Sequence, residues 1–114
     1  MASFNAEPSR LAIPTSNGYL FRNVQDLTYC RSDKNGTWIY CRDGHRFFSS
    51  KSIRGLEELL PENFFRIHAS VLINLSHVTS SNGNRSLQVV MIDGEKLDVS
   101  RRQHKKLKEI LVQL

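Results

Sequence analysis

The basic side chains near the end of the chain are the residues best suited to chemistry, and that chemistry is the binding of a polyanion. Between Lys96 and Lys108 there are six lysines and arginines against one acid, Asp98. The rest of the 114-residue chain has ten basic and ten acidic residues, so the formal net charge of +5 is concentrated in this segment. Such a concentration is typical of nucleic-acid binders, although the charged face of a solvated helix produces the same pattern.

Other kinds of functional chemistry lack the residue patterns that they require. The four histidines are dispersed, and Cys30 and Cys41 do not have the CxxC spacing of a zinc site. The sequence has no glycine-rich phosphate loop and no Ser/His/Asp spacing typical of a catalytic triad. We therefore expect a protein that is not an enzyme, with no cofactor, no metal and no small-molecule substrate.

Length and hydropathy predict one ordinary globular domain. No apolar run approaches the ~18 residues that a membrane-spanning helix needs, and Met1 to Arg10 has no apolar signal-peptide core. We expect a cytoplasmic protein with no membrane partner. Residues 1–9 are predicted to be a disordered or tag-like segment, and residues 10–114 to form a single domain.

Turn signals recur every eight to twelve residues, which is typical of an all-β domain. Hairpins are predicted at Ser16-Asn17-Gly18, Asn35-Gly36, Asp43-Gly44 and Asp93-Gly94. Asn-Gly and Asp-Gly pairs tolerate the positive φ angles of type I′ turns. If Asn35-Gly36 is the two-residue loop of its hairpin, Cys30 faces Cys41 at a distance that a disulfide tolerates. Two reduced thiols are the interpretation that we favour over a redox switch next to the predicted reading loop.

Two segments have helical spacing. The first is Ser52 to Leu60, whose apolar residues fall on one face and which Pro61 follows. The second is predicted to begin at Arg101, because Ser100 and Gln103 have the spacing of a capping box. Its apolar stripe consists of Leu107, Ile110, Leu111 and Leu114. Between the two helices, residues 64–78 are predicted to form two short buried strands with a kink near Ala69 and Ser70.

Three motifs in combination point to a family. The segment FFRIHASVLINLSHV, the strand pair around Asp93-Gly94 and the segment LDVSRRQHKKLKEIL together resemble the LytTR family of bacterial transcription-factor DNA-binding domains. The resemblance covers about Leu11 to Leu111. It implies a mainly β fold, an elongated stack of small antiparallel sheets with one short internal helix and one C-terminal amphipathic helix. It also implies loops that enter successive major grooves of double-stranded DNA, usually at paired direct repeats, and leaves a homodimer on the DNA open.

The resemblance places DNA readout in three segments of this chain: Asp33 to Thr37, His68 to Ser70, and Arg101 to Arg102. The candidate DNA-binding residues are Arg101, Arg102, Lys34, Asn35, Thr37, His68, Ala69, Ser70 and Lys105. Arg102 is the leading candidate, because an arginine held at a helix start can donate to both O6 and N7 of guanine. The alternatives are a solvated Arg102, an Asn35 that only forms the turn and a partly buried, structural His68.

Several positions qualify this prediction. Ala69 stands where the family usually has a polar or basic side chain, and its methyl group cannot donate a hydrogen bond but can contact a thymine methyl. Lys105, Lys106 and Lys108 are expected to provide unspecific attraction to phosphates. Asn74 also fits the family pattern, and we expect it to bond backbone near the kink rather than to bind DNA.

The sequence leaves three functions open. The first is sequence-specific binding of double-stranded DNA by a bacterial transcriptional regulator. The second is a regulatory interaction module of the same fold with weak or lost DNA binding, which Ala69 favours. The third is a single-strand binder, which needs exposed aromatic platforms. Trp38 and Tyr40 are expected instead to fill the core or brace their hairpin.

Overall fold

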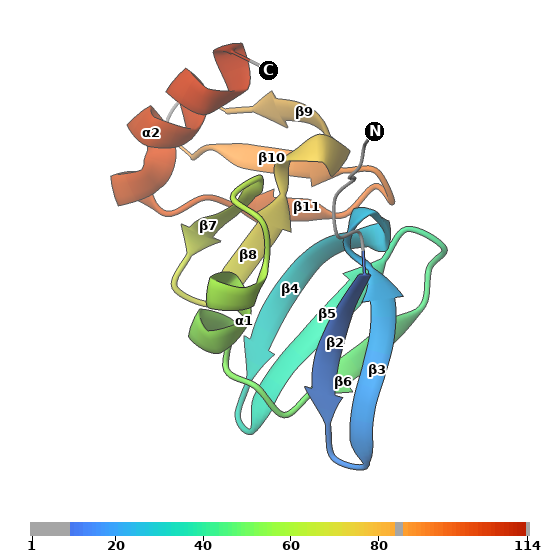
Figure 1. Ribbon diagram of the computed structural model, residues 1–114. Coiled ribbons are helices and arrows are strands. Elements are labelled where there is room, and N and C mark those ends of the chain that lie inside the picture. The colour runs from blue at the N-terminus through green and yellow to red at the C-terminus, as the bar shows by residue number, and fades with distance from the viewer. Residues whose placement is uncertain (1–9, 84–85, 114) are drawn as a thin grey trace.

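The computed structural model describes residues 10–83 and 86–113. In this part of the chain, ten strands form three antiparallel sheets, and two α-helices pack beside them (Figure 1). The predicted mainly β fold of small sheets, with one internal helix and one C-terminal helix, is confirmed. Two single-turn 3-10 helices, η1 (Val24–Asp26) and η2 (Leu75–His77), connect strands.

The central sheet has five strands in the order β6-β5-β4-β8-β7. In chain order they are β4 (Leu27–Asp33), β5 (Gly36–Cys41), β6 (Arg46–Ser49), β7 (Phe64–His68) and β8 (Val71–Asn74). Side chains alternate across this sheet, so Tyr29 belongs to the core on one face and Cys30 to the core on the other. The sheet is therefore covered on both faces.

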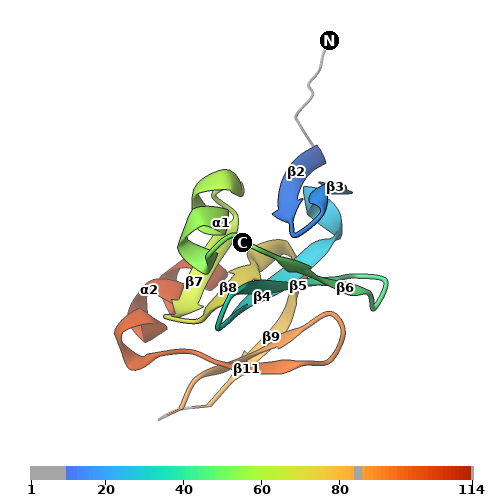
Figure 2. The same ribbon diagram turned by 90° about the horizontal axis from the view of Figure 1, so that it is seen from below.

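The covering elements form the outer layers, as Figure 2 shows. One face packs against α1 (Ile53–Leu59) and the hairpin of β2 (Arg10–Thr15) and β3 (Gly18–Asn23), with Leu27, Ile39 and Leu56 fully or almost fully buried. The other face packs against α2 (Arg101–Val112) and the sheet of β9 (Val78–Asn82), β10 (Gln88–Met91) and β11 (Lys96–Asp98). α2 belongs to the second of these two apolar cores, through Leu107.

The predicted turns all join paired strands, so the four hairpin predictions are confirmed. The predicted kink near Ala69 and Ser70 is a turn between β7 and β8, which pair antiparallel. Asn74 is buried at the end of β8, where its Nδ2 donates to the Leu27 carbonyl at 2.9 Å and its Oδ1 accepts from the Ser76 backbone. The interpretation of Asn74 as a structural residue is confirmed.

The register of the β4–β5 hairpin corrects one prediction. Asp33 pairs with Gly36, so the two-residue loop is Lys34-Asn35 and not Asn35-Gly36. Cys30 consequently faces Ile39, and the predicted Cys30–Cys41 facing pair is wrong. The physical reason lies at Gly36, where a Cβ would collide with the carbonyl oxygen of Ser49 on β6. This glycine provides room for the neighbouring strand instead of a positive φ angle.

The start of α2 corrects a second prediction. The helix does begin at Arg101, but the Ser100 side chain makes no capping hydrogen bond among the described residues. The Gln103 side chain donates instead to the Arg66 carbonyl on β7, at 2.8 Å. Leu107 is fully buried, and Ile110 and Leu111 pack against the same core. Leu114, the last residue of the predicted stripe, lies outside the described residues.

Candidate nucleic-acid interface

Backbone hydrogen bonds bring the three predicted readout segments to one edge of the molecule. The Ser32 backbone N–H donates to the Ser70 carbonyl at 2.9 Å, which joins the end of β4 to the β7–β8 turn. The Ser100 backbone N–H donates to the Ile67 carbonyl at 2.8 Å, which joins the start of α2 to β7. The three segments follow one another down the left side of Figure 1. Segments far apart in the sequence therefore form one contiguous edge.

The β4–β5 loop is held by Asp33. Its Oδ1 accepts from the Lys34 backbone N–H at 2.6 Å, and its Oδ2 accepts from Trp38 Nε1 at 3.0 Å. These bonds, the backbone bond above all, hold the pKa of the Asp33 carboxyl below its usual value. Trp38 packs edge-on against Phe48 and so braces the hairpin. Lys34 and Asn35 remain exposed at the tip of the loop.

Thr37 is not available for DNA contact, and its prediction as a binding residue is wrong. The residue is fully buried, and its hydroxyl donates to the Lys51 carbonyl at 2.9 Å. Side chains of a strand alternate between faces, so Thr37 shares the inward face of β5 with Ile39 and Cys41. That alternation was visible in the sequence and could have excluded Thr37.

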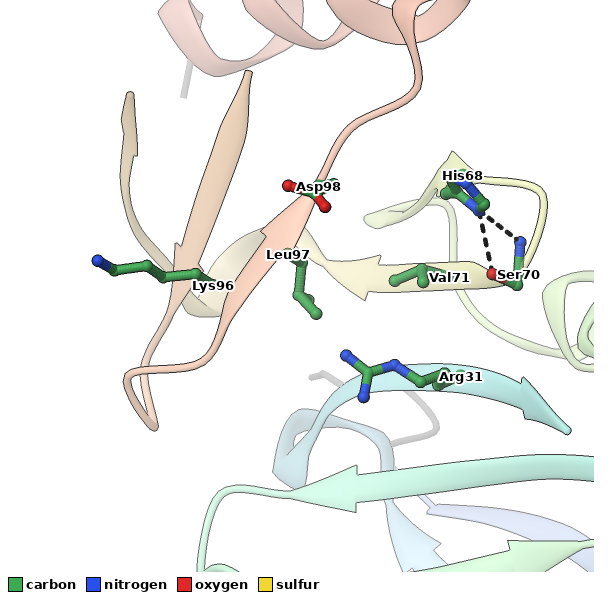
Figure 3. Close-up of a pocket in the computed structure, with 7 residues that line it drawn as sticks. All are labelled: Arg31, His68, Ser70, Val71, Lys96, Leu97 and Asp98. Carbon is green, nitrogen blue, oxygen red and sulfur yellow. Dashed lines mark hydrogen bonds between the residues drawn. The ribbon is translucent and has the colours of Figure 1, made fainter. Parts of the chain in front are cut away.

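The β7–β8 turn presents His68, with the exposed methyl group of Ala69 beside it. The Ser70 backbone N–H donates to His68 Nδ1 at 3.2 Å, and the Ser70 hydroxyl lies 3.0 Å from the same nitrogen (Figure 3). Because Nδ1 accepts a hydrogen bond, the neutral ring carries its proton on Nε2. His68 thus has an oriented N–H donor on an exposed side chain, while the Ser70 hydroxyl is already engaged.

A cleft of about 220 Å³ next to His68 has two basic residues that the sequence prediction missed. They are Arg31 on β4 and Lys96 on β11 (Figure 3). Arg31 lies 3.7 Å from Glu95, and both side chains are about 40% exposed or more, so this ion pair is weak. Arg31 lies two residues after the inward-facing Tyr29, so the alternation of strand side chains puts both on the same face of β4. This alternation could have located Arg31 from the sequence.

The first turn of α2 exposes Arg101 and Arg102, and Lys105 is exposed one turn further on. The aligned N–H groups of a helix start favour anions, which adds to the charge of these side chains. Lys106 Nζ lies 5.9 Å from the centre of the Phe65 ring on β7, so this lysine also packs against the sheet. The helix therefore combines a buried apolar side with an exposed basic side.

Both cysteines are buried free thiols in the core between the central sheet and α1. Burial raises the pKa of the Cys30 thiol to about 12 and also raises the pKa of Cys41. A thiol that stays protonated near neutral pH is a poor nucleophile. The position of these residues away from the readout edge gives no support to a redox switch beside the reading loop.

Comparison with known proteins gives the same assignment. The family model described as LytTr DNA-binding domain matches residues 17–112. The chain belongs to the LytTr family of DNA-binding domains. A solved LytTr domain from Bacillus cereus superposes with a TM-score of 0.76 over 92% of this chain and 98% of that chain, at 20% identity. At this low identity, the superposition supports the fold of this chain and nothing beyond the fold.

Longer regulators contain similar sequences. The LytTr domain is 30% identical to the sensory transduction protein LytT of Bacillus anthracis, over 96% of this chain and 46% of that protein. It is 28% identical to the transcriptional regulatory protein BtsR of Escherichia coli, over 77% of this chain and 37% of that protein. The chain thus spans less than half the length of these relatives. A family of DNA-binding domains also fits the expectation of a protein that is not an enzyme.

Across residues 10–83 and 86–113, no three histidine, cysteine or acidic side chains lie close enough together to hold a metal ion. Neither described helix has the length and apolarity that crossing a membrane requires.

Proposed function

We propose that this LytTr domain binds double-stranded DNA sequence-specifically as part of a bacterial transcriptional regulator. Its loops would enter the major groove, and the helix α2 would support them instead of lying along the groove. The relatives named as a sensory transduction protein and a transcriptional regulator support this role. The cytoplasm, where the DNA is, is the proposed location. We further propose that residues 10–114 form a single domain; the predicted N-terminal segment, residues 1–9, lies outside the described residues.

One observation carries the proposal. The bonds from Ser32 to Ser70 and from Ser100 to Ile67 place exposed donors from three segments along one edge. Groove readout requires several side chains that reach base edges at once, together with cations that reach the flanking phosphates. This edge supplies both kinds of group, from rigid elements with buried cores behind them.

The exposed residues divide into two proposed roles. Arg102, His68, Lys34 and Asn35 would approach base edges, with Arg102 donating to O6 and N7 of guanine. Ala69 would contact a thymine methyl, and the engaged Ser70 hydroxyl would help to fix His68. Arg101, Lys105 and the cleft residues Arg31 and Lys96 would pair with phosphates. Thr37 has no place in either role, because it is buried.

Selection from a random duplex library tests the function without a known target. The protein is bound to the library, the retained duplexes are amplified over several rounds, and the enriched sequences are read. We expect enrichment of two copies of one motif as a direct repeat, with about one helical turn between their centres, and a homodimer assembled on the DNA. Anisotropy titrations then compare the selected duplex with its scrambled version. A library that shows no enrichment contradicts the proposal.

Two features support the alternative of an interaction module with weakened DNA binding. The turn that should read DNA has a methyl group at Ala69, and Thr37 is unavailable as a donor in the neighbouring loop. Under this alternative the selected and scrambled duplexes bind equally weakly. The substitution Ala69→Asn, which adds a hydrogen-bond donor, would then increase DNA affinity. If Ala69 instead contacts a thymine methyl, the same substitution would remove the preference for thymine at that position.

A further inference from the structure

Arg66, which lies outside the predicted readout, joins two elements through its side chain. On β7, its Nη1 donates to the Ala69 carbonyl at 2.8 Å, and its Nη2 donates to Glu57 Oε1 on α1 at 2.9 Å. The side chain is only 22% exposed, and the buried Nε has no partner among the described residues. Both terminal nitrogens of the guanidinium thus donate hydrogen bonds to acceptors within the protein.

The backbone of the same residue holds a third element. The carbonyl oxygen of Arg66 accepts the bond from Gln103 Nε2, in the first turn of α2, at 2.8 Å. The next carbonyl, that of Ile67, accepts the bond from Ser100. Arg66 therefore contacts the β7–β8 turn, α1 and the start of α2 at once. Two of these three elements contain candidate DNA readers.

The strand needs such a support at this point. The pairing of β7 with β8 shifts between Arg66 and His68, as in a β-bulge. A bulge bends its strand, here at the point where the fully buried Ile67 is followed by the exposed His68. The Arg66 guanidinium spans this irregular part of the strand and ties the turn at Ala69 to α1. Without it, the turn loses its tie to α1.

We propose that Arg66 is a positioning residue that sets the separation of His68 and Arg102 on the readout edge without touching DNA itself. The inference rests on the proposed function. Readers on two different elements must be held within about 0.5 Å of their productive positions to reach base edges together. The side chain of Arg66 acts through Glu57 and the Ala69 carbonyl, while the backbone carbonyl at this position holds Gln103 of α2.

The substitution Arg66→Lys isolates this role from charge. A lysine keeps the positive charge, but its single ammonium cannot reproduce the planar fork that reaches Ala69 and Glu57 together. We expect the ratio of affinities for the selected and scrambled duplexes to fall roughly tenfold. Affinity for the scrambled duplex and its salt dependence should stay at the wild-type level, because Arg66 pairs with no phosphate.

A matched control makes the same chemical change elsewhere. Arg54 is an exposed arginine on α1, the helix that contains Glu57. Arg54→Lys should leave the affinity ratio unchanged. All titrations are made well below the melting temperature of each variant, which is measured in parallel. If Arg66→Lys does not fold, Glu57→Gln loosens the same tie with a smaller perturbation and a smaller expected loss.

A double substitution separates positioning from general destabilisation. If Arg66 acts through Arg102, then Arg66→Lys should lower the affinity ratio much less in an Arg102→Ala background than in the wild type. Additive losses overturn the positioning role, as does an equal loss of affinity for both duplexes. In either case the proposed function stands, since the wild type still discriminates. A wild type that binds both duplexes equally overturns the proposed function, and the positioning role falls with it.

Discussion

The Ser100 backbone N–H donates to the Ile67 carbonyl oxygen at 2.8 Å, so the residue before α2 is bonded to the strand that leads into the β7–β8 turn. Ile67 is fully buried, which makes this a fixed point. His68 follows Ile67 and Arg101 follows Ser100. The bond therefore links two candidate DNA-binding residues that are more than thirty positions apart in the chain.

Arg102→Ala should lower specificity more than it lowers general affinity. Loss of a paired contact to guanine reduces the discrimination between selected and scrambled duplexes by about 1–3 kcal/mol. Anisotropy titrations with the two duplexes measure this difference. Lys106→Ala is the comparison, because it removes a charge of the same helix and should weaken both duplexes alike. The opposite ranking would place the DNA on another face of the molecule.

Lys105→Ala should change the salt dependence of binding and leave specificity intact. Each phosphate contact contributes about −0.9 to the slope of log K against log salt, so the slope should become shallower by about that amount. Titrations between about 50 and 200 mM salt determine it. Arg42→Ala is the control, because it also removes one positive charge. Arg42 lies 3.7 Å from Asp26, at the end of β5 away from the loop, so this substitution should not alter the slope. An unchanged slope for Lys105→Ala would remove this residue from the interface.

Thr37→Val should destabilise the domain and spare DNA binding. The substitution keeps the shape of the side chain but leaves the Lys51 carbonyl without its 2.9 Å bond, which costs about 1–3 kcal/mol of unfolding free energy. Urea denaturation measures the loss, and titrations at low temperature measure the affinity. Thr79→Val removes a comparable 3.0 Å bond to the Val90 carbonyl at an exposed site and should cost less. A selective loss of specificity in Thr37→Val would restore Thr37 as a reader.

The free energy of unfolding should fall at alkaline pH, in part through Cys30. Burial raises the pKa of its thiol from 9.0 to about 12. Below pH 9 the thiol is protonated in both states. Above it the unfolded chain ionises while the folded chain cannot, so stability declines between these two values. Urea denaturation at about pH 8 and pH 10 measures the decline, which Cys30→Ala should reduce.

The same burial predicts an inert thiol pair. Thiol reagents should react with Cys30 and Cys41 only after unfolding, and mild oxidation should leave DNA affinity unchanged. A fall in affinity on oxidation that Cys30→Ser abolishes would instead support the redox switch that the sequence raised.

Local patterns in the sequence determined the elements of this fold. Turn pairs such as Asp43-Gly44 act through their own backbone geometry. The apolar faces of the two helices, which include Leu56 and Leu107, follow from the spacing of apolar residues within each helix. The same local information located the basic segment and the start of α2 at Arg101. The motif around His68 was specific enough to indicate the family, and with it the three segments proposed for readout.

What the tertiary structure decided was which side chains are free and which hold others in place. Thr37 lies two residues after the Lys34-Asn35 loop and looked like a loop donor, but packing buries it and its hydroxyl bonds the Lys51 carbonyl. Gln103 was predicted to cap α2, but it bonds Arg66 on another element. Arg66 itself carries no local signal of its role, because its partners Glu57, Ala69 and Gln103 meet only after three elements pack together. Such contacts depend on packing between segments that are distant in the chain, so no periodic pattern of residues within one segment predicts them.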